Sequence, residues 1–262
     1  MKMLEFMERT AREAGDFAMN EFERLGRSVS SKSTEKDIVT NADKATEELI
    51  ISRIREAYPG SGIFAEESGR DDHAGAEYLW VIDPIDGTSS YAAGLRSYCV
   101  SIALYRNGAP CAGVVYAPRL DELYAAETGC GAALNGKPIH VSARSELIES
   151  IAITGFACLR ANLPKNNLKT FCRIAPLVRG IRRIGSAALD ACRVASGLVE
   201  FFWEHPLSLY DVAAAAVIVR EAGGTVTDFD GGDDFPRKGI LFSNGLLHET
   251  ARSLILENDY RM

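Results

Sequence analysis

The stretch Leu79-Trp80-Val81-Ile82-Asp83-Pro84-Ile85-Asp86-Gly87-Thr88 carries more information about this chain than any other. Its four apolar residues are typical of a buried strand, and turn residues follow them. Pro84 fixes its own φ and steers Asp83 away from helical backbone, while Gly87 permits a tight turn. The pattern predicts that Asp83 and Asp86 lie on a stiff loop where a strand ends, which is where α/β proteins place ligand sites.

The two carboxylates and the peptide carbonyl of Ile85 between them are oxygen ligands of the kind that Mg²⁺ prefers. An acidic turn that caps the next helix is the plain alternative, and this stretch alone does not separate the two interpretations. Acidic residues elsewhere in the chain favour the metal site, as described below.

Composition limits the class of protein. The 262 residues are 47% hydrophobic and 25% charged, which suits one large domain or two modest ones with a sizeable core. A net charge of −7 argues against a nucleic-acid or anionic-membrane partner. The longest apolar stretch, residues 212–219, is too short to span a bilayer, and the charged N-terminus is unlike a signal peptide.

The six cysteines are scattered along the chain, with no Cys-x-x-Cys pair and no histidine at a zinc-ligand spacing. This arrangement argues against a zinc site and is typical of reduced thiols. Together with the lack of a signal peptide, it predicts a soluble cytoplasmic protein.

Periodicity divides the chain into two parts. The first part is predicted to hold helices at 4–25 and 43–57 and an antiparallel meander of strands at 99–105, 111–116 and 123–127. The second part alternates strands at 151–154 and 199–203 with helices at 186–196 and 211–222. We therefore expect an α/β (α+β) protein with subdomains at 1–145 and 146–262, the first holding most metal ligands and the second holding Asp211 and the substrate pocket.

Three further acidic positions accompany Asp83 and Asp86. Asp43 begins a predicted helix, Glu66-Glu67 follows a short predicted strand, and Asp211 opens the alanine-rich helix. Each has a plain interpretation, because Asp43 and Asp211 suit helix N-termini and the glutamates suit a solvated loop. If they converge, however, four or five carboxylates repel one another unless cations neutralise them. Two Mg²⁺ ions bridged by one carboxylate are the usual arrangement for displacing a phosphoryl group.

Together these positions resemble the inositol monophosphatase family of Mg²⁺-dependent phosphatases. The resemblance covers nearly the whole chain, in the ordered blocks Asp37 to Asp43, Ala65-Glu66-Glu67-Ser68, Trp80 to Thr88, Asn135 to Ile139, Arg183 to Ala188, Tyr210 to Ala214 and Glu221 to Gly224. It departs from the family pattern at Ala65, at Ser89-Ser90-Tyr91 and at Tyr210, and these substitutions leave every expected metal ligand in place.

The resemblance implies a role for each matching residue. One metal ion would be held by Glu66, Asp83 and the carbonyl of Ile85, a second by Asp83, Asp86 and Asp211, and a looser third by Glu66. Asp43 and Thr88, with the Glu66-bound metal, would position and activate the attacking water. The phosphate would meet the amides of Gly87, Thr88 and Ser89, and the substrate ring would meet Ala187 and Glu204. Mn²⁺ would substitute for Mg²⁺, and Li⁺ would inhibit.

The family fold is a layered αβαβα sandwich that usually assembles as a homodimer. The resemblance implies hydrolysis of a small polyol phosphate, with myo-inositol monophosphate as the leading candidate. Fructose 1,6-bisphosphate, histidinol phosphate and 3′-phosphoadenosine 5′-phosphate are rival substrates, and a regulatory binding protein on the same fold is the alternative of a different class. Asp190 flanks the expected pocket. Arg182 and Arg183 suit a second phosphate, a dimer partner or a solvated basic pair.

Overall fold

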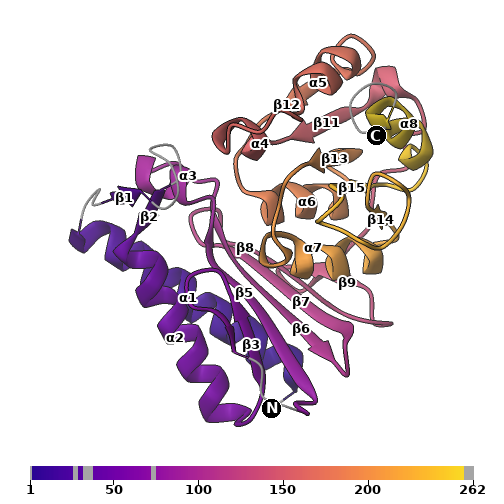
Figure 1. Cartoon of the computed structure of the whole chain (residues 1–262). Coiled ribbons are helices and arrows are strands. Elements are labelled where there is room, and N and C mark those ends of the chain that lie inside the picture. The colour runs from indigo at the N-terminus through magenta and orange to yellow at the C-terminus, as the bar shows by residue number, and fades with distance from the viewer. Residues whose placement is uncertain (1, 26–28, 32–37, 72–74, 257–262) are drawn as a thin grey trace.

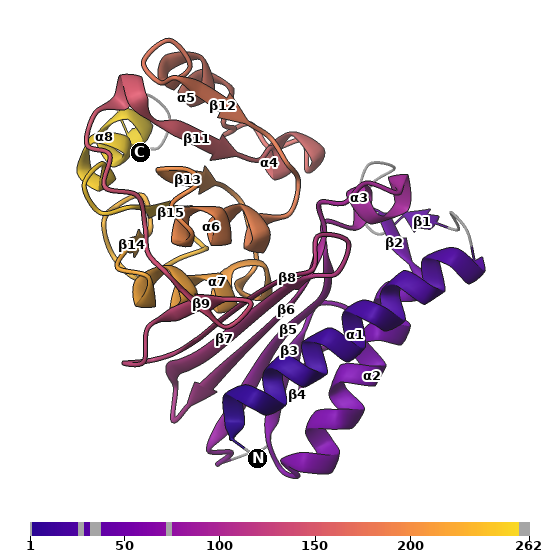
Figure 2. The same ribbon diagram turned by 180° about the vertical axis from the view of Figure 1, so that it is seen from behind.

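The computed structural model describes residues 2–25, 29–31, 38–71 and 75–256. It stacks five layers in the order helix, sheet, helix, sheet, helix (Figure 1), and Figure 2 shows the same stacking from behind. The αβαβα sandwich that the resemblance implied is therefore confirmed. Among the described residues, no helix combines the length and the apolar character needed to cross a bilayer.

The larger sheet has eight strands in the order β10-β9-β8-β7-β6-β5-β3-β4. All neighbours are antiparallel except β3 and β5, so the predicted antiparallel meander is confirmed. The strands are β3 (Gly62–Ala65), β4 (Gly69–Asp71), β5 (Tyr78–Asp86), β6 (Cys99–Arg106), β7 (Ala109–Ala117), β8 (Glu122–Glu127), β9 (Ala132–Leu134) and β10 (Lys137–Ile139).

Both faces of this sheet are covered by helices. One face carries α1 (Met3–Leu25) and α2 (Asn41–Ala57), close to the predicted bounds, and the other carries α7 (Leu209–Glu221). Side chains alternate between the faces along β5, since Trp80 and Ile82 pack with α1 and α2 while Val81 packs with α6 and α7. The apolar start of β5 is therefore buried on both sides.

The smaller sheet has five strands in the order β12-β11-β13-β15-β14. Its central strand alternates in the same way, because Phe202 faces α6 and α7 whereas Phe201 and Trp203 face α5 and α8. The elements of this half are β11 (Ile151–Thr154), α4 (Ala157–Arg160), α5 (Leu168–Ile174), β12 (Gly180–Arg182), α6 (Ala187–Ala195), β13 (Phe201–Glu204), β14 (Thr225–Thr227), β15 (Ile240–Ser243) and α8 (His248–Leu256).

Three short elements complete the described chain. Two strands, β1 (Val29–Ser31) and β2 (Ile38–Thr40), pair with each other alone, and α3 (Thr88–Ala93) follows the end of β5. A 3₁₀ turn, η1 (Leu147–Glu149), leads into β11. The boundary predicted near residue 145 falls just before this turn, between the strands of the two sheets. That the two parts form separate folding units stays a prediction.

Helix α7 lies directly on the large sheet, against β7 and its neighbours. A Cβ atom at Gly113 of β7 would overlap the carbonyl oxygen of Ala214 on α7, so only glycine allows this approach. The run of alanines from 213 to 216 is buried and keeps the facing surface of the helix small. One apolar core consequently includes residues of both halves, such as Val115 and Ala214.

One boundary was predicted wrongly. The strand expected to end at Ile82 continues through Asp86, because β6 pairs with it along its whole length. The pairing partners are Ser101 for Asp83 and Cys99 for Asp86, so three steps on β5 match two on β6. Pro84 cannot donate a ladder hydrogen bond, which is why the extra residue lies here.

Candidate active site

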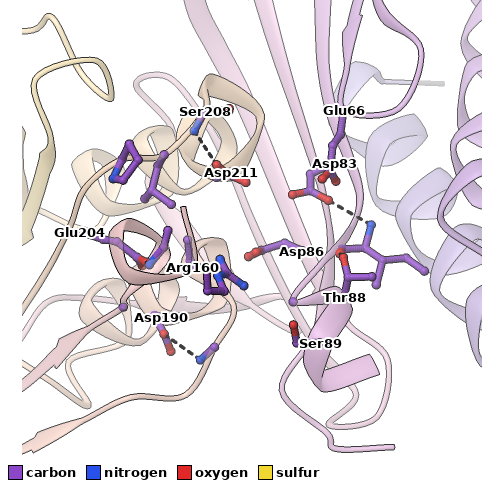
Figure 3. A pocket seen from close by; sticks show the side chains of 18 of the residues that line it. Glu66, Asp83, Asp86, Thr88, Ser89, Arg160, Asp190, Glu204, Ser208 and Asp211 are labelled. Carbon is purple, nitrogen blue, oxygen red and sulfur yellow. Dashed lines mark hydrogen bonds between the residues drawn. The ribbon is translucent and has the colours of Figure 1, made fainter. Parts of the chain in front are cut away.

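The irregularity in β5 brings its two aspartates together. In a regular strand, residues three apart point to opposite faces, and the extra residue between Asp83 and Asp86 cancels that alternation. One carboxylate oxygen from each of Asp83, Asp86 and Asp211 lies within 4.8 Å of the others. Figure 3 shows these three side chains pointing toward one another from β5 and α7. The structure thus assembles the trio that was expected for the second metal ion.

Asp211 reaches this trio from the first turn of α7. Ser208 is the N-cap, and Asp211 Oδ2 accepts a hydrogen bond from the Ser208 amide at 2.6 Å, which completes a capping box. The capping interpretation of Asp211 is therefore correct for its local structure. Capping occupies one carboxylate oxygen only, so Asp211 can cap the helix and face the other acids at once.

Asp86 is held rigidly by the helix that follows it in space. Its Oδ2 accepts hydrogen bonds at 2.7 Å from the Ser186 hydroxyl and at 2.7 Å from the Ala188 amide, at the start of α6. Ser186 is itself the N-cap of α6. The block from Arg183 to Ala188 therefore serves the site by orienting a carboxylate, in addition to placing Ala187 in the pocket wall.

The third acidic position pairs with Thr88. Asp43 lies in the first turn of α2 and is fully buried, and the Thr88 hydroxyl is 3.2 Å from both Asp43 Oδ1 and the carbonyl oxygen of Ile85. The predicted association of Asp43 with Thr88 is present in the structure. Asp37, at the start of the same sequence block, lies outside the described residues.

The loop that carries Glu66 is fixed by a residue that sequence reasoning missed. Glu47 of α2 is buried, and its carboxylate accepts hydrogen bonds from the amides of Glu67 at 2.8 Å and Ser68 at 2.7 Å. Glu47 follows Asp43 by one helical turn, so a pair of acids on one helix face was the available signal. Carboxylate oxygens of Asp43, Glu66 and Glu67 form a second group within 4.8 Å.

Burial and mutual repulsion raise the pKa values of these acids. Desolvation raises the pKa of Asp83 and of Asp211 well above the usual range, and the charges of Glu66 and Asp86 raise both further. Burial also raises the pKa of Asp86, although the hydrogen bonds from Ser186 and Ala188 counteract it. Three acids in such a position have too few donors to remain charged by themselves.

The residues suit a hard divalent cation. They offer oxygen ligands only, they converge within 4.8 Å, and their raised pKa values show that positive charge is what the site lacks. The described site includes neither a thiolate nor an imidazole among these groups, which is the donor set of Mg²⁺ or Mn²⁺ rather than of zinc.

A cavity of about 230 Å³ opens beside the trio. Its remaining walls include the other residues expected to meet substrate, namely Gly87, Thr88, Ser89, Ala187, Asp190 and Glu204. The Glu204 carboxylate is buried and accepts a hydrogen bond from the Ala157 amide at 3.0 Å. Burial raises the pKa of Glu204 to about 7, although the Ala157 amide and the charges of Arg160 and Arg183 lower it.

The two arginines noted in the sequence separate in the structure. Arg183 lines the cavity, whereas Arg182 is not part of its wall and donates to the carbonyl oxygen of Ile181 at 3.1 Å. Arg160, which sequence reasoning missed, lines the cavity beside Arg183. Arg160 ends the short helix α4, and nothing in the local sequence there indicates a pocket.

Comparison with known proteins agrees with this site. The family model for the inositol monophosphatase family matches residues 1–259. The chain is 41% identical to the Nus factor SuhB of Pseudomonas aeruginosa, over 91% of this chain and 90% of that protein. It is 38% identical to the fructose-1,6-bisphosphatase/inositol-1-monophosphatase of Thermotoga maritima, over 98% and 97%.

The fold agrees as well. The structure of an inositol monophosphatase from Anabaena superposes with a TM-score of 0.87 at 40% identity, covering 97% of this chain and 95% of that one. This likeness extends over both sheets and the helices between them, and the family is one of metal-dependent phosphoric monoester hydrolases. The chain belongs to the inositol monophosphatase family.

Proposed function

We propose that this chain is a Mg²⁺-dependent phosphatase that hydrolyses the monoester of a small polyol, with myo-inositol monophosphate as the leading substrate. The observation that carries the proposal is the convergence of Asp83, Asp86 and Asp211 within 4.8 Å on one wall of the cavity. A structural protein would gain nothing from burying three adjacent acids, because their desolvation destabilises the fold.

The ligand assignment follows from the sequence blocks and fits the placement of the side chains. Glu66, Asp83 and the Ile85 carbonyl would hold one ion, and Asp83, Asp86 and Asp211 would hold the second. A third would rest on Glu66, beside which Glu67 and Asp43 also lie. Bound there, the ions would supply the positive charge that activates water and stabilises the leaving oxygen.

The protein's own groups would position the nucleophile. Thr88 Oγ1 faces the cavity and is hydrogen-bonded to the fully buried Asp43. A water held by the Thr88 oxygen can give up its proton to that hydroxyl while the hydroxyl proton moves to Asp43 Oδ1. Glu66 stands on the same wall and completes the set of acids around the water. No covalent phospho-enzyme is needed in this scheme.

Substrate contacts divide between two walls. The phosphate would meet the amides of Gly87, Thr88 and Ser89, which open α3 and have no partner within the helix. The polyol would lie over Ala187 with its hydroxyl groups toward Glu204, whose carboxylate is the buried acceptor on that side. Asp190 borders the same region and is buried.

The test is phosphate release from four substrates: inositol 1-phosphate, fructose 1,6-bisphosphate, histidinol phosphate and 3′-phosphoadenosine 5′-phosphate. We expect turnover of inositol 1-phosphate with Mg²⁺ or Mn²⁺, inhibition by Li⁺, and loss of activity in excess EDTA. Mg²⁺ should also raise the melting temperature of wild type more than that of Asp211→Asn, which reports the site independently of turnover. Turnover that persists in excess EDTA would contradict the metal site.

A regulatory binding role is the second candidate, because one relative carries the name Nus factor SuhB. Binding alone does not require Glu66, Asp83, Asp86 and Asp211 together, and all four are present here. A protein that binds Mg²⁺ but releases no phosphate from any of the four substrates would favour this second role.

Location and assembly are part of the same proposal. We propose a cytoplasmic homodimer, in keeping with the family resemblance and with six cysteines that are all free in the structure. Light scattering on the purified protein tests the dimer, and a mass that corresponds to one chain would contradict it.

A further inference from the structure

Two arginines reach the substrate cavity from different elements. Arg160 is the last residue of α4, and Arg183 comes directly after β12. Both line the cavity on the side formed by the C-terminal half, across from the acids of β5. Figure 3 shows Arg160 extending toward Asp86 over the space between the two walls. The cavity thus has an acidic wall and a basic one.

Neither guanidinium has a close partner in the described part of the chain. Many other arginines of the structure form ion pairs, such as Arg144 with Glu200 at 2.8 Å and Arg106 with Glu77 at 2.7 Å. Among the described residues, no carboxylate lies within ion-pair distance of Arg160 or Arg183 and no hydrogen bond engages them. Both side chains are exposed, so their donors point to the cavity and to water.

The simplest role for these charges is to offset nearby acids at longer range. Arg160 and Arg183 do lower the pKa of Glu204, and Arg160 lowers that of Asp86. This role needs only positive charge near the wall. It leaves unused the planar, forked donors of both residues, which are the groups that bind phosphate in two parallel hydrogen bonds.

The backbone beside Arg183 is arranged for this placement. Gly185 has a φ of +110°, in the region that favours glycine, and a Cβ atom there would overlap the Arg183 guanidinium. The glycine therefore lets the Arg183 side chain fold back over the pocket wall. Arg182, one residue earlier, instead donates to the Ile181 carbonyl and stays outside the wall.

We propose that Arg160 and Arg183 form a second anion subsite, which binds a second phosphate group on the substrate. The inference rests on the proposed function, because it takes the scissile phosphate to lie at the Asp83, Asp86 and Asp211 trio. It narrows the substrate class to a small polyol or sugar that carries two phosphates, one hydrolysed and the other held by the arginines.

The test compares two substrates that differ only in the second phosphate, fructose 1,6-bisphosphate and fructose 1-phosphate. Release of the 1-phosphate is followed with Mg²⁺, and the fructose product is identified. For the wild type we expect kcat/KM to be at least ~10-fold higher for the bisphosphate, since one charge-assisted contact is worth about that factor. Arg160→Gln and Arg183→Gln should each reduce this ratio at least ~3-fold, mostly through KM, and the double variant should abolish it.

Arg182→Gln is the matched control, because it removes a neighbouring arginine that does not line the cavity. It should keep the wild-type ratio. A ratio that survives in the double variant, or that falls equally in Arg182→Gln, would overturn the subsite. Wild type that hydrolyses fructose 1-phosphate as well as the bisphosphate would overturn the subsite and leave the phosphatase intact. If no substrate releases phosphate under any metal condition, the proposed function itself fails.

Discussion

The hydroxyl oxygen of Thr88 lies 3.2 Å from Oδ1 of Asp43, which joins the loop after β5 to the first turn of α2. Asp43 is fully buried, whereas Thr88 borders the cavity, so this pair links the substrate space to a carboxylate that water does not reach. The two residues lie far apart in sequence and meet only because both elements pack at the same end of the large sheet.

Removing the Thr88 hydroxyl tests this link. Thr88→Val keeps the shape of the side chain, and we expect kcat to fall by ~10²–10⁴, as for the loss of a group that takes part in proton transfer. Thr88→Ser retains the hydroxyl and should stay within about tenfold of wild type. Equal activity of Thr88→Val and Thr88→Ser, measured under saturating Mg²⁺, would show that the hydroxyl has no role in the chemistry.

Asp211→Asn separates capping from metal binding. Asn can accept the Ser208 amide as Asp does, so the capping box and the fold should survive. We expect kcat to fall at least ~10²-fold, as for the loss of a positioned catalytic group. Without metal, the melting temperature should rise, because one of three repelling acids is gone. Asp233→Asn, at an exposed ion pair with Arg220, is the control and should change neither quantity in this way.

Glu204→Gln tests substrate discrimination and its pH dependence. The variant should discriminate less well among polyol phosphates while hydrolysing an aryl phosphate nearly as wild type does. Since the pKa of Glu204 is raised to about 7, wild type carries a charged Glu204 at pH 8 and a mostly neutral one at pH 6. The difference between wild type and variant should thus be large at pH 8 and small at pH 6, in kcat/KM ratios. A difference independent of pH would assign Glu204 to the fold.

His248 predicts a loss of stability on acidification. It is buried and hydrogen-bonded to Ser243 at 2.8 Å and to Thr227 at 2.9 Å, and burial lowers its pKa below the usual value of about 6.5. A lowered pKa in the folded state contributes stability above about pH 6.5, and that contribution is lost as the pH falls through the folded-state pKa.

The measurement is urea unfolding of wild type and His248→Gln between pH 8 and pH 5. The variant should be about 1–3 kcal/mol less stable at pH 8, because Gln cannot serve both partners, and the gap should close toward pH 5. Using the difference is necessary, since the raised pKa values of Asp83 and Asp211 make the metal-free protein more stable in acid. A gap that stays constant would show that His248 does not titrate in this range.

The sequence predicted those parts of the site in which a residue type and a local element coincide. Asp43, Asp83 and Asp211 were identified because acids at strand ends and helix starts suit metal ligands, and the resemblance then supplied their grouping. Arg160 and Glu47 were missed, since their contacts lie across the fold and no local pattern marks them. The end of β5 was misplaced for a related reason: Pro84 was taken as a stop, but pairing with β6 carries the strand past it.

The close seat of α7 on β7 constrains the chain in a way that no chemical role explains. Gly113 touches neither substrate space nor any acid of the trio, yet a side chain there would lift the helix that carries Asp211 off the sheet that carries Asp83. A mutational scan scored by activity would therefore rank residue 113 beside the metal ligands. In evolutionary terms, a position in plain backbone contact is as closed to change as the acids themselves, because it acts as the fixed support against which they are aligned.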